Sequence, residues 1–334
     1  MKKLLSAVLL FTLMLTVSCN AKTTPASSAS AAAESSQGQG MSAAVEVGKG
    51  PGAESAAGTG TKTGPEVSET AAGPGAAAAN ARQGFILPEG TTLETRFAVP
   101  EGYIRTLYSE ESFGSFVRNY SLKPDGSPVL LWTKVPKGNQ WDHAAVFDMF
   151  VEDELDVQQC ADSVMRIYAE YFRATGQYDR IRFHFVSGFL CDYNTYMQGN
   201  RVRVDGSSVT WVQSKAPEDS DRVFNEYLKI VYAYASTLSM EGESAETGIQ
   251  DLQIGDVFLY GGSPGHVAMV ADVCEKDGKK AFLLAQGYMP AQEFHIIKNP
   301  RHADDPWYYE EEVQYPFETQ AYTFPEGSLR RMQY

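Results

Sequence analysis

The sequence predicts an α+β domain in which one long helix packs on an antiparallel β-meander, with additional strands and loops on its N-terminal side. Apolar residues recur at three- and four-residue steps over 157–171, which is the period of a helix with one buried stripe. Three later apolar segments, 255–260, 266–273 and 281–286, are separated by turn residues. This pattern is typical of strands that pair with their neighbours in the sequence.

Residues 1–19 have the pattern of a lipoprotein signal peptide. Two lysines precede an apolar run over 4–17, and Cys19 follows it; the run is too short for a comfortable transmembrane span. We expect Cys19 to be lipidated and to become the mature N-terminus, with simple cleavage as the alternative. The lipid would anchor the protein to a membrane of the cell envelope, on the extracytoplasmic side.

Residues 20–83 consist mainly of Ala, Gly, Ser, Thr and Pro. They cannot bury enough apolar surface to offset the entropy of ordering, and are predicted to be a flexible, disordered tether. Residues 84–334 contain all four tryptophans and are predicted to form a single folded domain. The formal net charge of −14 argues against nucleic acid as a partner, because binding phosphates requires a positive field.

The part of the domain before the meander is predicted from local patterns. Turn residues alternate with short apolar stretches over 91–132, which indicates strands and loops with one short helix around 112–119. The long helix can be capped by Asp153 or Asp156 and should end near Gly176.

Three segments connect the long helix to the meander. Residues 181–186 alternate like a strand, 223–238 have the pattern of a second helix, and 241–248 have the composition of a loop.

The turn at 276–278 sets the register of the last two strands. A three-residue loop would pair Glu275 with Lys279. Gln286 would then lie on the same face as His266, whereas a two-residue turn would place it on the other face.

Cys160 and His266 have the local settings that a thiol hydrolase needs. Cys160 lies in the first turn or two of the long helix, where the dipole and backbone amides favour a thiolate and can stabilise an oxyanion. Gln158 and Gln159 are candidates for a further oxyanion donor. His266 opens a strand and can act as general base, while Gln286 can orient its imidazole without a buried charge.

Each of these residues, taken singly, also has an ordinary explanation. Cys160 would be a core residue, His266 a loop-to-strand histidine, and Gln286 a solvated or backbone-bonded side chain. The catalytic hypothesis depends on their combination and order along the chain.

Four side chains are weaker candidates for substrate binding: Gln159, His295, Arg182 and His184. His295 alternates with apolar residues and can line a cleft, but a paired surface strand explains the pattern equally well. Arg182 and His184 alternate with phenylalanines, as residues of a half-buried strand do.

With Cys19 assigned to the lipid, Cys160, Cys191 and Cys274 remain. This odd number requires at least one free thiol or an intermolecular bridge. A Cys191–Cys274 disulfide would leave Cys160 free, and the sequence does not decide whether it forms. The chain has no CxxC and no HxxxH pattern, so neither a metal nor another cofactor is expected.

Four blocks of the chain are similar to the bacterial domain of unknown function 4846 family: 158–166, 183–201, 255–266 and 283–292. The resemblance spans about 84–334. The family has no established activity, so the resemblance implies membership of a family but not a mechanism.

A more distant similarity links the chain to the NlpC-type and CHAP cell-wall amidases, which share the papain-like fold. The common order is a cysteine-bearing helix, a Gly-Asp-Val segment, a Gly-His strand and a polar strand. The resemblance implies that Cys160 attacks a peptidoglycan amide, His266 acts as base and Gln286 orients it. This chain has a longer insertion before the histidine strand and lacks the usual residues around the nucleophile. Some of these domains bind without cleaving, and others act on lipids.

We therefore expect an envelope-anchored cysteine peptidase or amidase that cleaves an amide of peptidoglycan or of an envelope peptide through an acyl-enzyme. The alternative is a non-catalytic binding lipoprotein that uses the same cleft, with Cys160 in the core. The tether at 20–83 suits an anchored domain whose substrate cannot diffuse to it.

Overall fold

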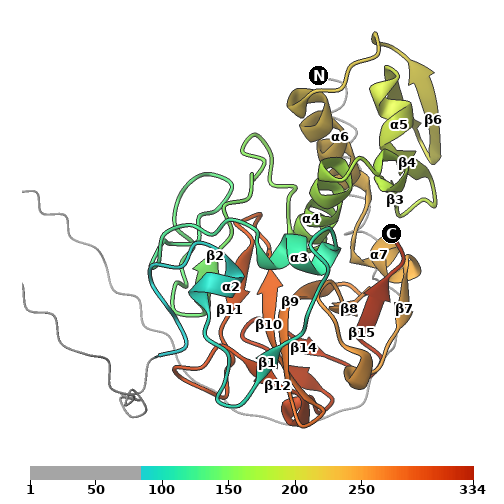
Figure 1. Ribbon diagram of the computed structural model, residues 1–334. Helices are drawn as coiled ribbons and strands as arrows, with labels where there is room; N and C mark the ends of the chain where they lie inside the picture. Colours follow the sequence, from blue (N-terminus) through green and yellow to red (C-terminus); the bar gives the residue numbers. More distant parts are fainter. Residues whose placement is uncertain (1–83) are drawn as a thin grey trace, which may run out of the picture. The chain divides into compact units, whose positions relative to one another are not determined.

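An antiparallel sheet of nine strands lies at the centre of the computed structural model, which describes residues 84–334 (Figure 1). The predicted signal peptide, its Cys19 and the tether lie outside the described residues. The nine strands are β1 (Ile104–Arg105), β2 (His143–Val146), β7 (Ser244–Glu246), β8 (Val257–Tyr260), β9 (His266–Lys276), β10 (Lys279–Gln286), β11 (His295–Ile297), β12 (Tyr308–Tyr309) and β15 (Leu329–Met332).

The other elements are helices and small hairpins. The helices are α2 (Leu93–Arg96), α3 (Phe113–Arg118), α4 (Cys160–Ala174), α5 (Tyr193–Met197), α6 (Asp221–Tyr234) and α7 (Thr237–Gly242), with 3₁₀ turns η1 (Tyr178–Arg180), η2 (Ile249–Asp251) and η3 (Glu310–Glu312). The hairpins pair β3 (Arg182–His184) with β4 (Leu190–Asp192), β5 (Asn200–Asp205) with β6 (Ser208–Gln213), and β13 (Phe317–Glu318) with β14 (Thr323–Phe324). Of these elements, α5, α6, β3, β4 and β6 lie together at one end of the sheet (Figure 1). Over the described range, no helix has the length and apolar character that a membrane crossing requires.

The strand order across the sheet is β2-β11-β10-β9-β8-β15-β7, while β1 pairs with β9 and β12 with β10. All of these pairings are antiparallel. Strands β8 to β11 follow one another both in sequence and in space. The first three form the predicted meander, and β11 extends it. The prediction of a mixed helix and strand protein with a large antiparallel sheet is confirmed.

Helices α3 and α4 pack on β9, whose first nine residues are all buried. The short helix predicted around 112–119 is α3, and its first turn is capped by Ser112, whose Oγ accepts a hydrogen bond from the Ser115 N–H at 3.2 Å. The long helix α4 ends at Ala174, and Gly176 follows with φ of 71°. A glycine in this left-handed conformation terminates helices without steric cost, so the predicted end is confirmed.

Helix α4 starts later than predicted. Neither Asp153 nor Asp156 caps it: Gln159 is the N-cap residue, and Asp162 accepts a hydrogen bond from the Gln159 N–H at 2.9 Å. Asp156 instead accepts a hydrogen bond from the Ala291 N–H at 2.6 Å. This contact between distant parts of the chain competes with capping, and local sequence patterns do not reveal it.

Two further predictions are wrong in detail. The segment 223–238 is not one helix, because α6 ends at Tyr234 and α7 begins after Ser236, whose Oγ accepts a hydrogen bond from the Leu238 N–H at 3.1 Å. The expected loop at 241–248 contains β7, which pairs with β15 near the C-terminus. A serine cap breaks the helix, and a distant strand orders the loop.

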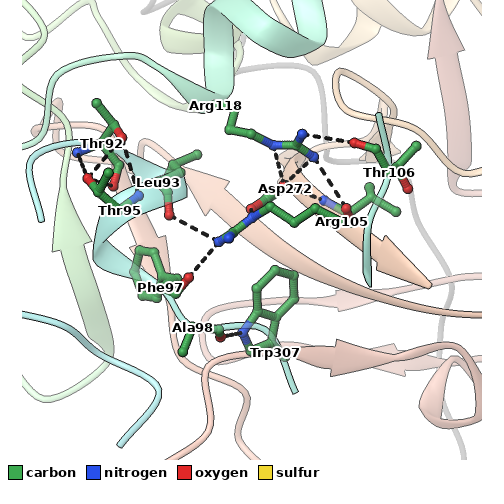
Figure 2. Close-up of polar contacts among 11 residues, drawn as sticks. Thr92, Leu93, Thr95, Phe97, Ala98, Arg105, Thr106, Arg118, Asp272 and Trp307 are labelled. Carbon is green, nitrogen blue, oxygen red and sulfur yellow. Dashed lines mark hydrogen bonds and ion pairs between the residues drawn. The ribbon is translucent and has the colours of Figure 1, made fainter. Parts of the chain in front are cut away.

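Asp272 of β9 joins the N-terminal segment to the middle of the sheet (Figure 2). Its carboxylate is completely buried and forms ion pairs with Arg105 of β1 at 2.9 Å and with Arg118 of α3 at 2.8 Å. Arg118 also donates to the carbonyl of Thr106, and Arg105 to that of Phe97, just after α2. The two guanidinium groups therefore tie α2, β1 and α3 to β9 through charge-assisted hydrogen bonds.

Candidate active site

Cys160 is the first residue of α4 and lies against the start of β9. Helix α4 packs on β9, and the backbone N–H groups of Val267 and Ala161 lie close enough to lower the pKa of the Cys160 thiol. Because Val267 directly follows His266, the N-terminus of the helix and the histidine strand meet at this point. Part of Cys160 remains accessible to solvent.

Gly287, the residue after β10, allows α4 to approach the sheet this closely. A Cβ atom at Gly287 would lie 2.7 Å from the Ser163 Oγ and 2.8 Å from the carbonyl oxygen of Gln159. Both distances are shorter than van der Waals contact, and the Gln159 oxygen belongs to the backbone. The absence of a side chain at Gly287 therefore sets how near Cys160 comes to the end of β10.

We expect Gly287→Ala to lower the free energy of unfolding by about 1–3 kcal/mol, because the added methyl group overpacks the contact with α4. Gly138→Ala is the matched control, since a Cβ atom there has no neighbour within 4 Å. Urea unfolding followed by circular dichroism measures both variants. Equal stability of the two would contradict the close approach at Gly287.

His266 begins β9 opposite Tyr260, at the end of β8. Its Nε2 lies 2.8 Å from the Oε1 of Gln286 at the end of β10. Because a carbonyl oxygen can only accept, Nε2 carries the proton and Nδ1 carries the lone pair. An imidazole held in this tautomer can accept a proton at Nδ1.

The turn before Gln286 is not the predicted three-residue loop. It contains two residues, Asp277 and Gly278, with φ of 50° and 77°, and Lys276 pairs with Lys279. Two residues with positive φ form the tight turn that matches the twist of a hairpin. With this turn alone, Gln286 would lie on the face opposite to His266.

A β-bulge between the two strands reverses this effect. Leu283 pairs with Asp272, but the next residue, Leu284, pairs with Val270. Ala271 is therefore an extra residue on β9, and the register shifts by one. Beyond the bulge, the alignment is the one predicted from the three-residue loop, and Gln286 shares the face of His266.

Aromatic rings surround His266. The ring centroids of Tyr288, Tyr322 and Phe324 lie 5.1, 5.2 and 5.9 Å from that of the imidazole. His266 is only 2% exposed and Gln286 only 1%. The base and its amide partner are thus enclosed, while the cysteine keeps part of its surface in solvent.

Burial holds both reactive groups in their neutral forms. It lowers the pKa of His266 to about 4, although the bond to Gln286 opposes this shift. Burial, helped by the negative charge of Asp162, raises the pKa of Cys160 to about 12, and the backbone N–H donors offset only part of this. The sequence suggested a thiolate stabilised by the helix N-terminus; in this enclosed arrangement desolvation outweighs the helix dipole.

His295 lies next to this group but is completely buried. It pairs with Gln286 across β10 and β11, and its Nδ1 lies 2.8 Å from the carbonyl oxygen of Glu293. The ring centroid of His143, on β2, is 6.2 Å away. The structure places His295 inside the sheet rather than on a surface strand, so its role in contacting substrate stays a prediction.

The other candidate residues for substrate binding lie in two places. Arg182 and His184 are on β3, in a hairpin separate from the large sheet, where His184 Nδ1 contacts Glu243 at 2.7 Å. The structure does not bring them to the cysteine. Gln159 caps α4 beside Cys160. Gln158 is fully buried and bonded to the backbone of two residues before the helix, so its amide is already engaged.

Three surface cavities of the described residues are not lined by the cysteine, the histidine or the glutamine. One of about 510 Å³ lies along α4 and α6, and the others lie beside α3 and α5. Among residues 84–334, no group of three or more His, Cys, Asp or Glu side chains is placed to hold a metal ion. Cys191 and Cys274 are both buried and free, so the disulfide left open by the sequence does not form.

Sequence reasoning did not find Tyr322. It lies far from Cys160 and His266 in the sequence, in a short hairpin with no motif of its own, and only the fold brings it to the imidazole. Tyr288 was partly predictable, because the predicted strand register extends from Gln286 to Tyr288 and places it near His266.

Fold and site together define a mixed α/β protein in which a histidine and a glutamine on adjacent strands are hydrogen-bonded, and the helix that begins with a cysteine packs on both strands. The family described as Domain of unknown function (4846) matches residues 93–331, and the chain belongs to this family. Comparisons with curated proteins and with solved structures returned no match.

Proposed function

We propose that this protein is an envelope-anchored cysteine hydrolase that cleaves an amide bond in peptidoglycan or in an envelope peptide. The observation that supports this most directly is the 2.8 Å contact between His266 Nε2 and Gln286 Oε1, on two strands that pack against the helix whose first residue is Cys160. An oriented base next to a potential nucleophile is the arrangement that thiol catalysis requires. The order of these elements along the chain also supports a papain-like core, as in the NlpC-type amidases.

The reaction would begin with proton transfer from the Cys160 thiol to His266 Nδ1. The thiolate attacks the carbonyl carbon of the amide, and the oxyanion that forms is stabilised by backbone N–H groups at the start of α4. His266 then donates its proton to the leaving amine, and the C–N bond breaks to give an acyl-enzyme. Water, deprotonated by His266, hydrolyses the thioester and regenerates the thiol.

The pKa values of the enclosed site oppose the first of these steps. With the pKa of Cys160 near 12 and that of His266 near 4, the neutral pair is strongly favoured over the ion pair. Entry of water or of a polar substrate would reduce the desolvation that causes both shifts. Catalysis through these residues therefore requires the site to open.

The burial of His266 favours a second candidate, a non-catalytic binding module of the cell envelope. In this alternative Cys160 is a packing residue whose thiol stays protonated. The two candidates differ in one property, the dependence of hydrolysis on the thiol.

Digestion of purified peptidoglycan, with chromatographic analysis of the released muropeptides, separates the candidates. The wild-type protein is expected to release new products, and Cys160→Ala to reduce their rate at least about a thousandfold, because removal of a nucleophile eliminates the covalent route. Cys191→Ala, which removes a buried cysteine on β4, is the control and should retain activity. Identical product profiles for wild type and Cys160→Ala would contradict the hydrolase, and sedimentation of both proteins with peptidoglycan would then support the binding module.

A further inference from the structure

The β13–β14 hairpin covers the imidazole of His266. Two of its residues, Tyr322 and Phe324, pack against that ring with centroid distances of 5.2 and 5.9 Å. The hairpin is not a part of the large sheet. The hairpin therefore forms part of the cover that encloses the base.

The base of the hairpin is firmly packed. Phe317 and Phe324, which pair with each other, are 2% and 0% exposed. The Phe317 ring lies 4.5 Å from that of Phe258 on β8. These apolar contacts fix the two ends of the hairpin to the sheet.

The tip, residues 319–322, is held differently. Its residues are all partly exposed, and two phenolic hydrogen bonds attach it to the rest of the domain. The Tyr322 hydroxyl donates to the carbonyl of Pro264 at 3.0 Å, and the Tyr288 hydroxyl donates to the carbonyl of Ala321 at 3.3 Å. Hydrogen bonds that water can replace contribute little to stability, so the tip is weakly attached compared with its base.

The tip also lies near the first turn of α4: Ala321 accepts a hydrogen bond from Tyr288, and the preceding residue, Gly287, packs on Gln159 and Ser163. Burial, the phenols of Tyr260 and Tyr288, and the charge of Cys160 all raise the pKa of Tyr322. The Tyr322 ring covers the imidazole, and its hydroxyl bonds to the loop just before His266.

We propose that residues 319–322 form a lid that opens about the buried base of the hairpin, and that Tyr322 controls access to Cys160 and His266. This inference rests on the proposed function for its biological meaning. An opened lid would admit water and substrate to the site, which removes the desolvation that keeps the thiol and imidazole neutral. A closed state that predominates while an open state is sampled is a common behaviour of such segments.

Alkylation of Cys160 in the full chain measures the opening without any substrate. Two reagents with the same reacting group are used: iodoacetamide, and an iodoacetamide that carries a bulky dye. Tyr322→Ala is expected to raise the rate with the bulky reagent by at least roughly tenfold, and Tyr322→Phe by roughly fivefold, because the latter loses one hydrogen bond. Tyr178→Phe loses a comparable phenolic bond, at 3.2 Å to Asp219 on another part of the surface, and should leave the rate unchanged.

Mass spectrometry of the labelled protein identifies the modified cysteine. Labelling confined to Cys160 with the expected increase supports the lid, while unchanged rates in both Tyr322 variants would overturn it. If Tyr322→Ala also exposes Cys191 or Cys274, the variant has lost its fold, and Tyr322→Phe together with Tyr288→Phe decides the question by the same criteria. The labelling result is independent of peptidoglycan digestion. Accelerated labelling of the Tyr322 variants without any hydrolysis by the wild type would support the lid and reject the hydrolase. Hydrolysis by the wild type with unchanged labelling rates would reject only the lid.

Discussion

Replacement of Asp272 by alanine is expected to lower the free energy of unfolding by about 3–5 kcal/mol. The carboxylate is fully buried and pairs with Arg105 and Arg118 at 2.9 and 2.8 Å. Its removal leaves Arg118, itself only 6% exposed, as a buried cation without its partner. The cost arises mainly from that unpaired charge rather than from the loss of a favourable ion pair.

Urea unfolding at neutral pH, followed by tryptophan fluorescence, measures this loss. Glu218→Ala serves as the matched control, since Glu218 pairs with Arg222 at 2.5 Å on the surface, where water solvates both partners and little change is expected. A loss for Asp272→Ala no larger than that for Glu218→Ala would mean that the buried cluster does not hold the N-terminal segment.

The same cluster bears on the site through its position. Asp272 directly follows Ala271, the extra residue of the β-bulge that places Gln286 on the face of His266. The two arginines thus hold β9 next to the irregularity that sets the register. The N-terminal segment is in this way connected to the geometry of the candidate active site.

Between pH 7 and pH 4, the His295→Asn variant is expected to lose about 3 kcal/mol less of its free energy of unfolding than the wild type does. Burial, with the charges of Lys137, His143 and His266, lowers the pKa of His295 to about 3; only its bond to the Glu293 carbonyl opposes this. The unfolded chain then binds protons below its ordinary pKa of about 6.5, while the folded protein does not. The stability contributed by neutral His295 is present above that value and is lost as the pH falls toward 3.

Two other buried groups make the comparison between variants necessary. His266, whose pKa is near 4, changes the free energy of unfolding with pH in the same direction as His295. Asp162 acts in the opposite direction: burial raises its pKa to about 8, so its contribution is present below about 4 and is lost as the pH rises through 8. Because the wild-type curve contains all three, only the difference between wild type and variant isolates His295.

Urea unfolding at several pH values between 4 and 7 gives this difference. Asparagine is chosen because its amide N–H can still donate to the Glu293 carbonyl, which His295 Nδ1 contacts at 2.8 Å. Parallel curves for wild type and His295→Asn would contradict the assignment of a neutral, buried histidine.

The local elements of the fold were largely predictable. The stripe of α4, its end before Gly176, the helix after Ser112 and the order of β8 to β10 all follow from the spacing of apolar and turn residues. Such spacing reflects the 3.6-residue period of helices and the two-residue period of strands, which any short window of sequence carries.

The errors occur where distant residues compete with a local preference. Asp156 does not cap α4 because it accepts a hydrogen bond from Ala291 instead, and the expected loop at 241–248 pairs with β15. The relation of Gln286 to His266 was predicted from a turn that does not form. Gln286 still lies on the face of His266 because two differences from the predicted hairpin offset each other: the turn is one residue shorter, and a bulge adds one residue to β9.

By itself, the sequence determined that a cysteine lies at the start of a helix, that a histidine opens a strand of a meander, and that the chain belongs with a family matched by its motifs. Only the tertiary structure decided the register that joins His266 to Gln286, the cover supplied by Tyr322, and the neutral state of the thiol and imidazole. Periodicity is a property of neighbouring residues along the chain. Register, burial and pKa depend on groups that the fold brings together from far apart, and those groups leave no mark on the local pattern.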